Sequence, residues 1–167
     1  MGAYHASITP EQAELIRNSP LFFIATADPG LTSGPHGIGP VNVSPRGAVP
    51  LHILSPSRVA FLDYPGSGNE TARHALAGGP VTLMVCSFGE DAAIVRLYGR
   101  ARVTPVEESP LAERLLRDVA EALQHPRQVI ELDIERTSTS CGYGVPVMAF
   151  VRERGAGDRG RRYKAPA

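Results

Sequence analysis

The chain of 167 residues has the length of one domain, and 43% of its residues are hydrophobic, enough to build a packed core. That composition excludes a chain that is disordered throughout. The 17 basic and 17 acidic side chains cancel, so net charge gives no reason to expect nucleic acid or an anionic membrane as a partner.

Cysteine usage and the N-terminal segment bear on the compartment. Cys86 and Cys141 form no Cys-x-x-Cys motif, and the first residues lack the apolar segment of a secretory signal. No apolar stretch approaches the roughly 20 residues that cross a bilayer. The five histidines lack the spacing of metal ligands. We therefore expect a cytoplasmic protein with no membrane span and no metal site.

The first predicted element is a short helix capped by Thr9, where Gln12 completes a capping-box spacing. A strand follows over residues 21–27, which are rich in aromatic and β-branched side chains. After a Gly/Pro-rich loop, a second strand is predicted over 40–44. Residues 45–47, Pro-Arg-Gly, should turn the chain there.

Residues 48–54 should return as a strand, and a tight turn over 55–58 leads to a further strand over 59–64. A helix is predicted over 69–77, where glycines 78 and 79 end it. Short strands joined by tight turns indicate an antiparallel meander rather than βαβ units.

The second half continues with a hairpin of strands 81–88 and 92–103. An amphipathic helix is predicted over 109–123. Alternation over 128–136 predicts a half-buried strand, and 145–151 should form the last strand.

These strands and two or three peripheral helices predict a mainly β, antiparallel Greek-key split β-barrel, which leaves few exposed strand edges. We expect one domain over residues 1–152. Residues 153–167, rich in Arg and Gly, should form a basic flexible tail.

Residues 66–71, Gly-Ser-Gly-Asn-Glu-Thr, lie between a strand and a helix. Unpaired N–H groups at a helix start attract anions, and glycines let the backbone approach them closely. The segment could therefore cradle a phosphate. Taken alone, the local pattern is more typical of an ordinary turn with a helix cap.

Several single side chains suggest further chemistry, although each also has an ordinary structural explanation. Arg46 could grip a phosphate through paired hydrogen bonds or be a solvated turn residue. Arg96 interrupts an apolar strand, so it faces either a buried acceptor or solvent. Tyr143 could cap a planar ligand or pack in a structural loop, and Cys141 could be a reactive thiol.

Several segments follow one another in a characteristic order: FFIATA at 22–27, VNVSPRG at 41–47, RVAFLDYPGSGNET at 58–71, VTLMVC at 81–86, VRLYGRA at 95–101 and SCGYGVP at 140–146. In this order they resemble the pyridoxamine 5′-phosphate oxidase-like family of FMN-binding split-barrel proteins. The resemblance covers about residues 9–152.

The resemblance implies a homodimer with FMN held in a cleft at the dimer interface. It implies phosphate contacts from the strand end at 44–46 and from the turn at 67–71, with the flavin ring beside residues 42–43 and 63–64. The cofactor-binding positions implied are Asn42, Val43, Ser44, Arg46, Asp63, Tyr64, Ser67, Gly68, Asn69, Glu70 and Thr71.

The chain also departs from the biosynthetic oxidase. Residues 68–70, Gly-Asn-Glu, stand where that enzyme has Ser-Arg-Lys-like chemistry, and the absence of tryptophan removes its C-terminal substrate motif. These departures argue against pyridoxamine phosphate as the substrate.

The leading hypothesis is an FMN-dependent oxidoreductase acting on a small molecule that the sequence does not name. The alternatives are a deazaflavin or haem in the same cleft, and a non-catalytic dimeric binding protein that has lost the flavin. The sequence offers no obvious acid or base, so no catalytic side chain is assigned.

Overall fold

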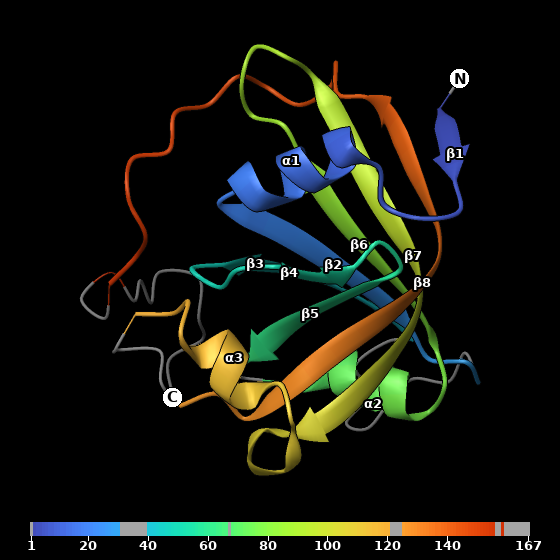
Figure 1. Cartoon of the computed structure of the whole chain (residues 1–167), viewed down its shortest axis with the longest axis vertical. Coiled ribbons are helices and arrows are strands. Elements are labelled where there is room, and N and C mark those ends of the chain that lie inside the picture. Colours follow the sequence, from blue (N-terminus) through green and yellow to red (C-terminus); the bar gives the residue numbers. More distant parts are fainter. Residues whose placement is uncertain (1, 31–39, 67, 121–124, 156–157, 159–167) are drawn as a thin grey trace.

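The computed structural model describes residues 2–30, 40–66, 68–120, 125–155 and 158, and its main feature is one curled antiparallel sheet (Figure 1). Its eight strands are β1 (Ala3–His5), β2 (Leu21–Ala27), β3 (Val41–Gly47), β4 (His52–Ser55), β5 (Arg58–Asp63), β6 (Pro80–Cys86), β7 (Ala93–Pro105) and β8 (Gln128–Cys141). The helices are α1 (Pro10–Asn18), α2 (Glu70–Leu76) and α3 (Ala112–Leu116), with a 3-10 turn η2 (Val106–Glu108).

The strand order is β3-β2-β6-β7-β8-β5-β4, with β1 added to β8, and every pairing is antiparallel. Among the described residues β3 pairs only with β2 and β4 only with β5, so the sheet stays open between its end strands. This arrangement confirms the mainly β, antiparallel split-barrel prediction. The simple meander is confirmed only for β6, β7 and β8; β4 follows β3 in sequence but lies at the opposite end of the sheet.

The main hydrophobic core fills the inside of the curl. Phe61 packs its ring edge against Phe22, with centroids 5.1 Å apart at 68°. Helix α1 adds Ile16 to this core, and its predicted capping box is confirmed. The Thr9 hydroxyl accepts from the Gln12 N–H at 3.3 Å, and the Gln12 side chain accepts from the Thr9 N–H at 3.1 Å.

Strand β8 extends to Cys141, five residues past the predicted end, and its first half is buried on both faces. Glu131, expected to face solvent, is buried. It lies between two arginines of the flanking strands, Arg58 at 4.0 Å and Arg102 at 3.8 Å. This pairing compensates the buried charge and explains why the alternation of exposure fails here.

Four further predictions are wrong. Residues 45–47 belong to β3, and the chain reverses after them, where Ala48 has φ 58°. Residues 48–54 therefore do not pair back onto β3; β4 pairs with β5. Residues 145–151 form no strand, and the helix predicted over 109–123 is only the five residues of α3, with 121–124 outside the described part of the chain.

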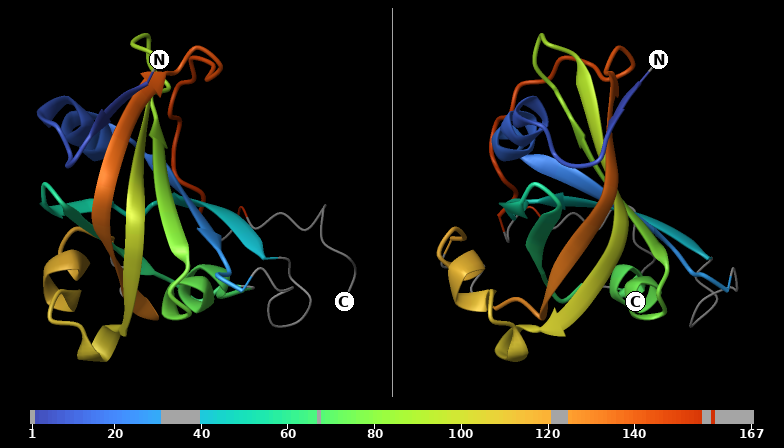
Figure 2. Two further views of the ribbon diagram at one scale, coloured as in Figure 1. Left: turned by 90° about the vertical axis from the view of Figure 1, so that its right-hand side faces the viewer. Right: turned by 45° about the vertical axis from the view of Figure 1, so that its right-hand side comes forward.

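The β4–β5 hairpin lies between α1 and α3 on one side of the molecule, away from α2 (Figure 2). A second apolar cluster joins α3 to the outer face of β5 and β8 through Leu62, Leu115 and Val129. At its border His52 of β4 is only 10% exposed and pairs with Asp118 at 3.4 Å. Burial lowers the pKa of His52, the nearby Arg114 lowers it too, and Asp118 opposes them.

The lowered pKa of His52 makes the free energy of unfolding depend on pH. The unfolded chain binds this proton at higher pH than the folded chain, so stability present above about pH 6.5 is lost as the pH falls through the folded pKa. We expect His52→Gln to lose less stability than the unmodified protein between pH 7 and pH 5, measured by urea unfolding. Parallel stability curves for the two proteins would contradict this assignment.

Candidate functional site

The candidate site is built around Asp63, the last residue of β5, whose side chain is 1% exposed. Arg46 lies 3.1 Å from one carboxylate oxygen, and Arg127 lies 2.7 Å from the other. The Gln128 side-chain amide donates to the second oxygen at 2.7 Å. A buried carboxylate is thus held by two guanidinium groups and an amide from two strand ends, the end of β3 and the start of β8. Burying a charge requires such compensation.

The inward face of β3 continues the polar surface. Alternation places Asn42, Ser44 and Arg46 on one face of this strand. The Asn42 amide donates to the Ser44 hydroxyl at 3.1 Å and to the Thr71 hydroxyl at 3.3 Å. Because Thr71 lies in the first turn of α2, this contact joins β3 to the start of that helix.

Two further hydrogen bonds position α2. Gln128 donates to the Asn69 side chain at 3.0 Å, so one amide bridges Asn69 and Asp63. Thr26 of β2 and Nδ1 of the buried His74 lie 2.9 Å apart. The start of α2 is therefore fixed against β8, and its last turn is fixed against β2.

The structure brings Asn42, Ser44, Arg46, Asp63, Asn69 and Thr71 together, although three elements contribute them.

The other predicted positions are placed differently. Val43 points to the outer face of β3 and is 64% exposed. Tyr64 packs against the second apolar cluster, where burial raises its pKa, while its backbone carbonyl accepts from Arg127 at 3.4 Å. Ser67 lies outside the described residues.

Glu70, which would repel a phosphate, is engaged by its own helix. Its carboxylate lies 3.3 Å from the Arg73 guanidinium and close over Gly68, where a Cβ would collide with it. Glu70 therefore forms an i,i+3 ion pair and is not an isolated negative charge.

The described cluster keeps an excess of positive charge. Arg46, Arg73 and Arg127 face two carboxylates, Asp63 and Glu70, which leaves one net positive charge. The buried Nε groups of these three arginines have no hydrogen-bond partner among the described residues. Unsatisfied buried donors beside a net positive charge fit an anionic ligand.

Sequence reasoning missed Arg127, Gln128, Arg73 and His74. The first two directly precede the apolar alternation of β8, and the pairing of β5 with β8 places Gln128 opposite Asp63. Only that register shows that a basic residue and an amide meet the end of β5. A search for polar residues at both ends of a predicted antiparallel pair could have found them.

The remaining candidates lie away from this cluster. Arg96 is partly buried and donates to the Ser140 hydroxyl at 2.9 Å, so its acceptor is neutral. Tyr143 is 94% exposed and Cys141 is exposed, so the expectation of a buried tyrosine is wrong. Within the described ranges no group of His, Cys, Asp and Glu could hold a metal ion, and no helix is long and apolar enough to cross a membrane.

The open antiparallel sheet, with polar strand ends meeting at the start of α2, defines a split-barrel domain. The family model described as pyridoxamine 5′-phosphate oxidase matches residues 8–141, and the chain belongs to this family.

Relatives support the same assignment. A pyridoxamine 5′-phosphate oxidase family protein, ustO of Aspergillus flavus, is 34% identical over 150 residues, which are 89% of this chain and 57% of the relative. The chain thus spans little more than half the length of this curated relative.

Solved structures match the fold. A putative pyridoxamine 5′-phosphate oxidase from Lactobacillus delbrueckii is 25% identical with a TM-score of 0.58, covering 80% of this chain and 94% of that one. HupZ from Group A Streptococcus is 21% identical with a TM-score of 0.59, covering 78% and 91%. An FMN-binding protein from Syntrophomonas wolfei is 11% identical with a TM-score of 0.54, covering 83% and 84%.

Proposed function

We propose that this chain binds FMN at the cluster around Asp63 and acts as an FMN-dependent oxidoreductase on a small molecule. The observation that carries the proposal is the meeting of β3, the end of β5 and the start of α2, which places Arg46, Ser44 and Thr71 around one polar surface. Family membership and the FMN-binding protein among the matched folds support a flavin as the ligand.

The residues present fit the phosphate end of FMN. A guanidinium, two hydroxyls and the backbone at the start of α2 are hydrogen-bond donors to phosphate oxygens. Arg46 and Ser44 would hold the phosphate from β3, and residues 68–71 from the opposite side. Asn42, on the same face of β3, is the side chain of this set suited to bonding a ring nitrogen or oxygen.

Once bound, the flavin supplies hydride transfer, whereas the protein supplies binding, orientation and electrostatics. In this chain Asp63 fixes Arg46 and Arg127, and Gln128 fixes both Asp63 and Asn69. These contacts hold the binding groups in place before the ligand arrives, which lowers the ordering cost of binding. No side chain is assigned as a general acid or base.

The proposed assembly is a homodimer with the cofactor cleft at its interface. Val41 and Val43 on the outer face of β3 are 61% and 64% exposed, directly behind the polar face of the same strand. Apolar side chains exposed side by side favour burial against a partner. A second copy packed over the outer face of β3 would shield both valines, directly behind the site.

A second candidate is a binding protein without flavin. Asp63 already neutralises part of the charge on Arg46 and Arg127, so the cluster is stable without an added anion. The visible spectrum of the purified protein, before and after adding FMN, separates the candidates. Flavin bands support the proposal. A Soret band or a deazaflavin band would identify haem or a deazaflavin as the cofactor in place of FMN. A colourless protein that takes up no FMN supports the second candidate.

We expect Arg46→Ala to weaken FMN binding by about 1.5–3 kcal/mol, because a charge-assisted hydrogen bond to phosphate is lost. This corresponds to roughly a 10- to 150-fold rise in Kd, measured by quenching of flavin fluorescence. The Kd of Arg46→Lys for FMN should lie between those of the unmodified protein and Arg46→Ala, since lysine keeps the charge and loses the paired donors.

The matched control is Arg58→Ala. Arg58 also lies in a strand and pairs with an aspartate, Asp133 at 2.8 Å, but at the other end of β5. The FMN affinity of Arg58→Ala should equal that of the unmodified protein. Equal affinity of the Arg46 and Arg58 variants would remove Arg46 from the site.

A further inference from the structure

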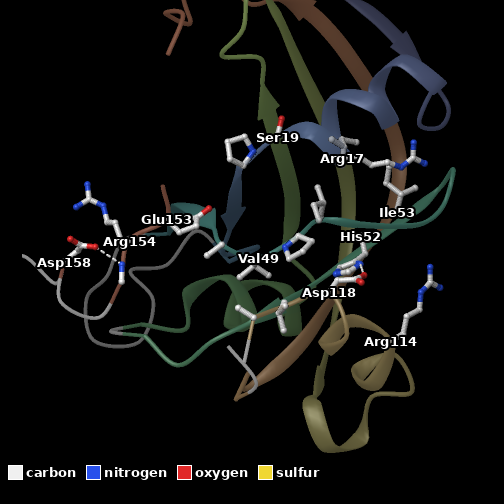
Figure 3. Close-up of a pocket in the computed structure, with 18 residues that line it drawn as sticks. Arg17, Ser19, Val49, His52, Ile53, Arg114, Asp118, Glu153, Arg154 and Asp158 are labelled. Atoms are coloured by element: carbon white, nitrogen blue, oxygen red, sulfur yellow. Dashed lines mark hydrogen bonds and ion pairs between the residues drawn. The ribbon is translucent and has the colours of Figure 1, made fainter. Parts of the chain in front are cut away.

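A cavity that shares no lining residue with the cluster around Asp63 lies along the edge strand β4. It has a volume of about 1110 Å³ and runs between α1, the edge strand β4 and the segment that begins with α3 (Figure 3). His52 is paired with Ala60, so both side chains lie on one face of the hairpin. Ile53, paired with Val59, lies on the opposite face, so the cavity is lined from both faces of this edge strand.

The cavity has an apolar wall. Ile16 of α1 and Leu51 before β4 are buried, and Val49, Ile53 and Val119 are partly buried beside them. A wall of this kind favours an apolar ligand body, since its burial removes apolar surface from water on both sides.

Three arginines line the cavity, and two of them, Arg17 and Arg114, lie at the end away from Arg154. Figure 3 draws Arg17, from the last turn of α1, above the His52–Asp118 pair and Arg114 of α3 below it. Neither guanidinium has an ion-pair or hydrogen-bond partner among the residues that the structure describes. Unpaired guanidiniums at the rim of an apolar cavity suit a carboxylate or a phosphate.

One acidic side chain, Asp118, lies at the same end of the cavity as these two arginines, so the guanidiniums remain in excess there. Asp118 pairs with His52, and Asp158 pairs with Arg152. Glu153 and Asp158 lie at the far end of the cavity from Arg17 and Arg114 (Figure 3). The buried Nε2 of His52 has no hydrogen-bond partner in the described part of the chain. A polar group of a ligand could therefore form a hydrogen bond with it.

We infer that this cavity binds an amphipathic organic anion, with its carboxylate or phosphate held by Arg17 and Arg114 and its apolar body against Val49, Ile53 and Val119. The site is separate from the proposed flavin site, so it stands or falls independently of that proposal. The ligand class follows from two charges at one end of an apolar cavity.

The test uses three eight-carbon probes in isothermal titration calorimetry with the purified full-length chain: octanoate, octyl phosphate and the neutral 1-octanol. We expect at least one anion to bind with one-to-one stoichiometry. The Kd of 1-octanol should be at least roughly tenfold higher than that of this anion. Binding of octanoate alone, of octyl phosphate alone, or of both identifies the anionic group. Equal binding of 1-octanol and the anions, or no binding of either anion, overturns the inference.

Matched variants locate the site. Arg17→Gln and Arg114→Gln should each raise the Kd of the anion roughly tenfold, whereas the exposed Arg117→Gln on the same helical segment should leave it unchanged. Arg46→Gln should also leave it unchanged, which separates this cavity from the flavin site. The anion should shift the side-chain NMR signals of His52; unshifted signals, or equal weakening by Arg117→Gln, would place the anion elsewhere and overturn the inference.

Discussion

Replacing Phe61 with alanine is expected to lower the free energy of unfolding by about 4 kcal/mol. Phe61 is 1% exposed at the centre of β5, and its ring meets Phe22 edge to face. The deletion removes a large apolar side chain from the middle of the curl and leaves a cavity that the paired strands β5 and β8 cannot close. Chemical denaturation at a fixed protein concentration measures the loss, because a dimer would make stability depend on concentration.

Two variants make the Phe61 measurement specific. Phe61→Leu keeps most of the volume and should cost less than about 1.5 kcal/mol. Phe150→Ala removes the same ring from a position that is 60% exposed and should change stability by less than about 0.5 kcal/mol. Equal losses for the Phe61 and Phe150 alanine variants would show that the core is not packed around β5 as described.

The elements that the sequence predicts well are those whose signals are local. Thr9 and Gln12 lie three residues apart, and the capping box needs only these two side chains. The β6–β7 hairpin and the end of α2 near Gly78 likewise depend on short turns, and Gly78 does adopt a positive φ of 78°. Local propensity decides such features before any tertiary contact forms.

The turn predicted at residues 45–47 shows where local signals fail. Pro45 and Gly47 are typical of turns, yet both lie in β3. Because β3 is the end strand of the sheet, a proline there needs no N–H for a second neighbour. The strand's position in the sheet, which is a tertiary property, overrides the turn preference.

The strand predicted over 145–151 fails for a related reason. The segment is rich in β-forming side chains, but Val147 and Val151 are largely exposed and no regular pairing forms. A strand needs a free edge at the right distance and register as well as β propensity. Sequence alone does not reveal which edges remain free.

The residues of the candidate site likewise divide into those that a local segment reveals and those that only strand pairing places. Arg46 and the turn before α2 were recognised because each lies in one short segment. Their meeting point, Asp63 with Arg127 and Gln128, depends on the β5–β8 register across more than sixty residues. The sequence therefore predicts Asp63 and the polar groups of β3 and of the start of α2, whereas the pairing of distant strands supplies Arg127 and Gln128.

Asp63→Asn is expected to lower the free energy of unfolding by about 3 kcal/mol, because it leaves Arg46 and Arg127 close together without their shared carboxylate. The side chains of Arg46 and Arg127 are 26% and 30% exposed. Solvent screening therefore keeps the loss near the lower end of the range for broken buried ion pairs. Adding Arg46→Met should recover part of the loss, since one of the two unpaired charges is then absent; the double-mutant cycle measures this coupling.

The same substitution should have the opposite effect on anion binding. Removing the internal carboxylate frees two guanidiniums, so FMN should stabilise Asp63→Asn against unfolding by more than it stabilises the unmodified protein. The comparison of unfolding with and without a fixed excess of FMN measures both effects in one experiment. If FMN stabilises the variant less, Asp63 contributes to binding directly; if it stabilises neither protein, the arginines around Asp63 serve only the fold.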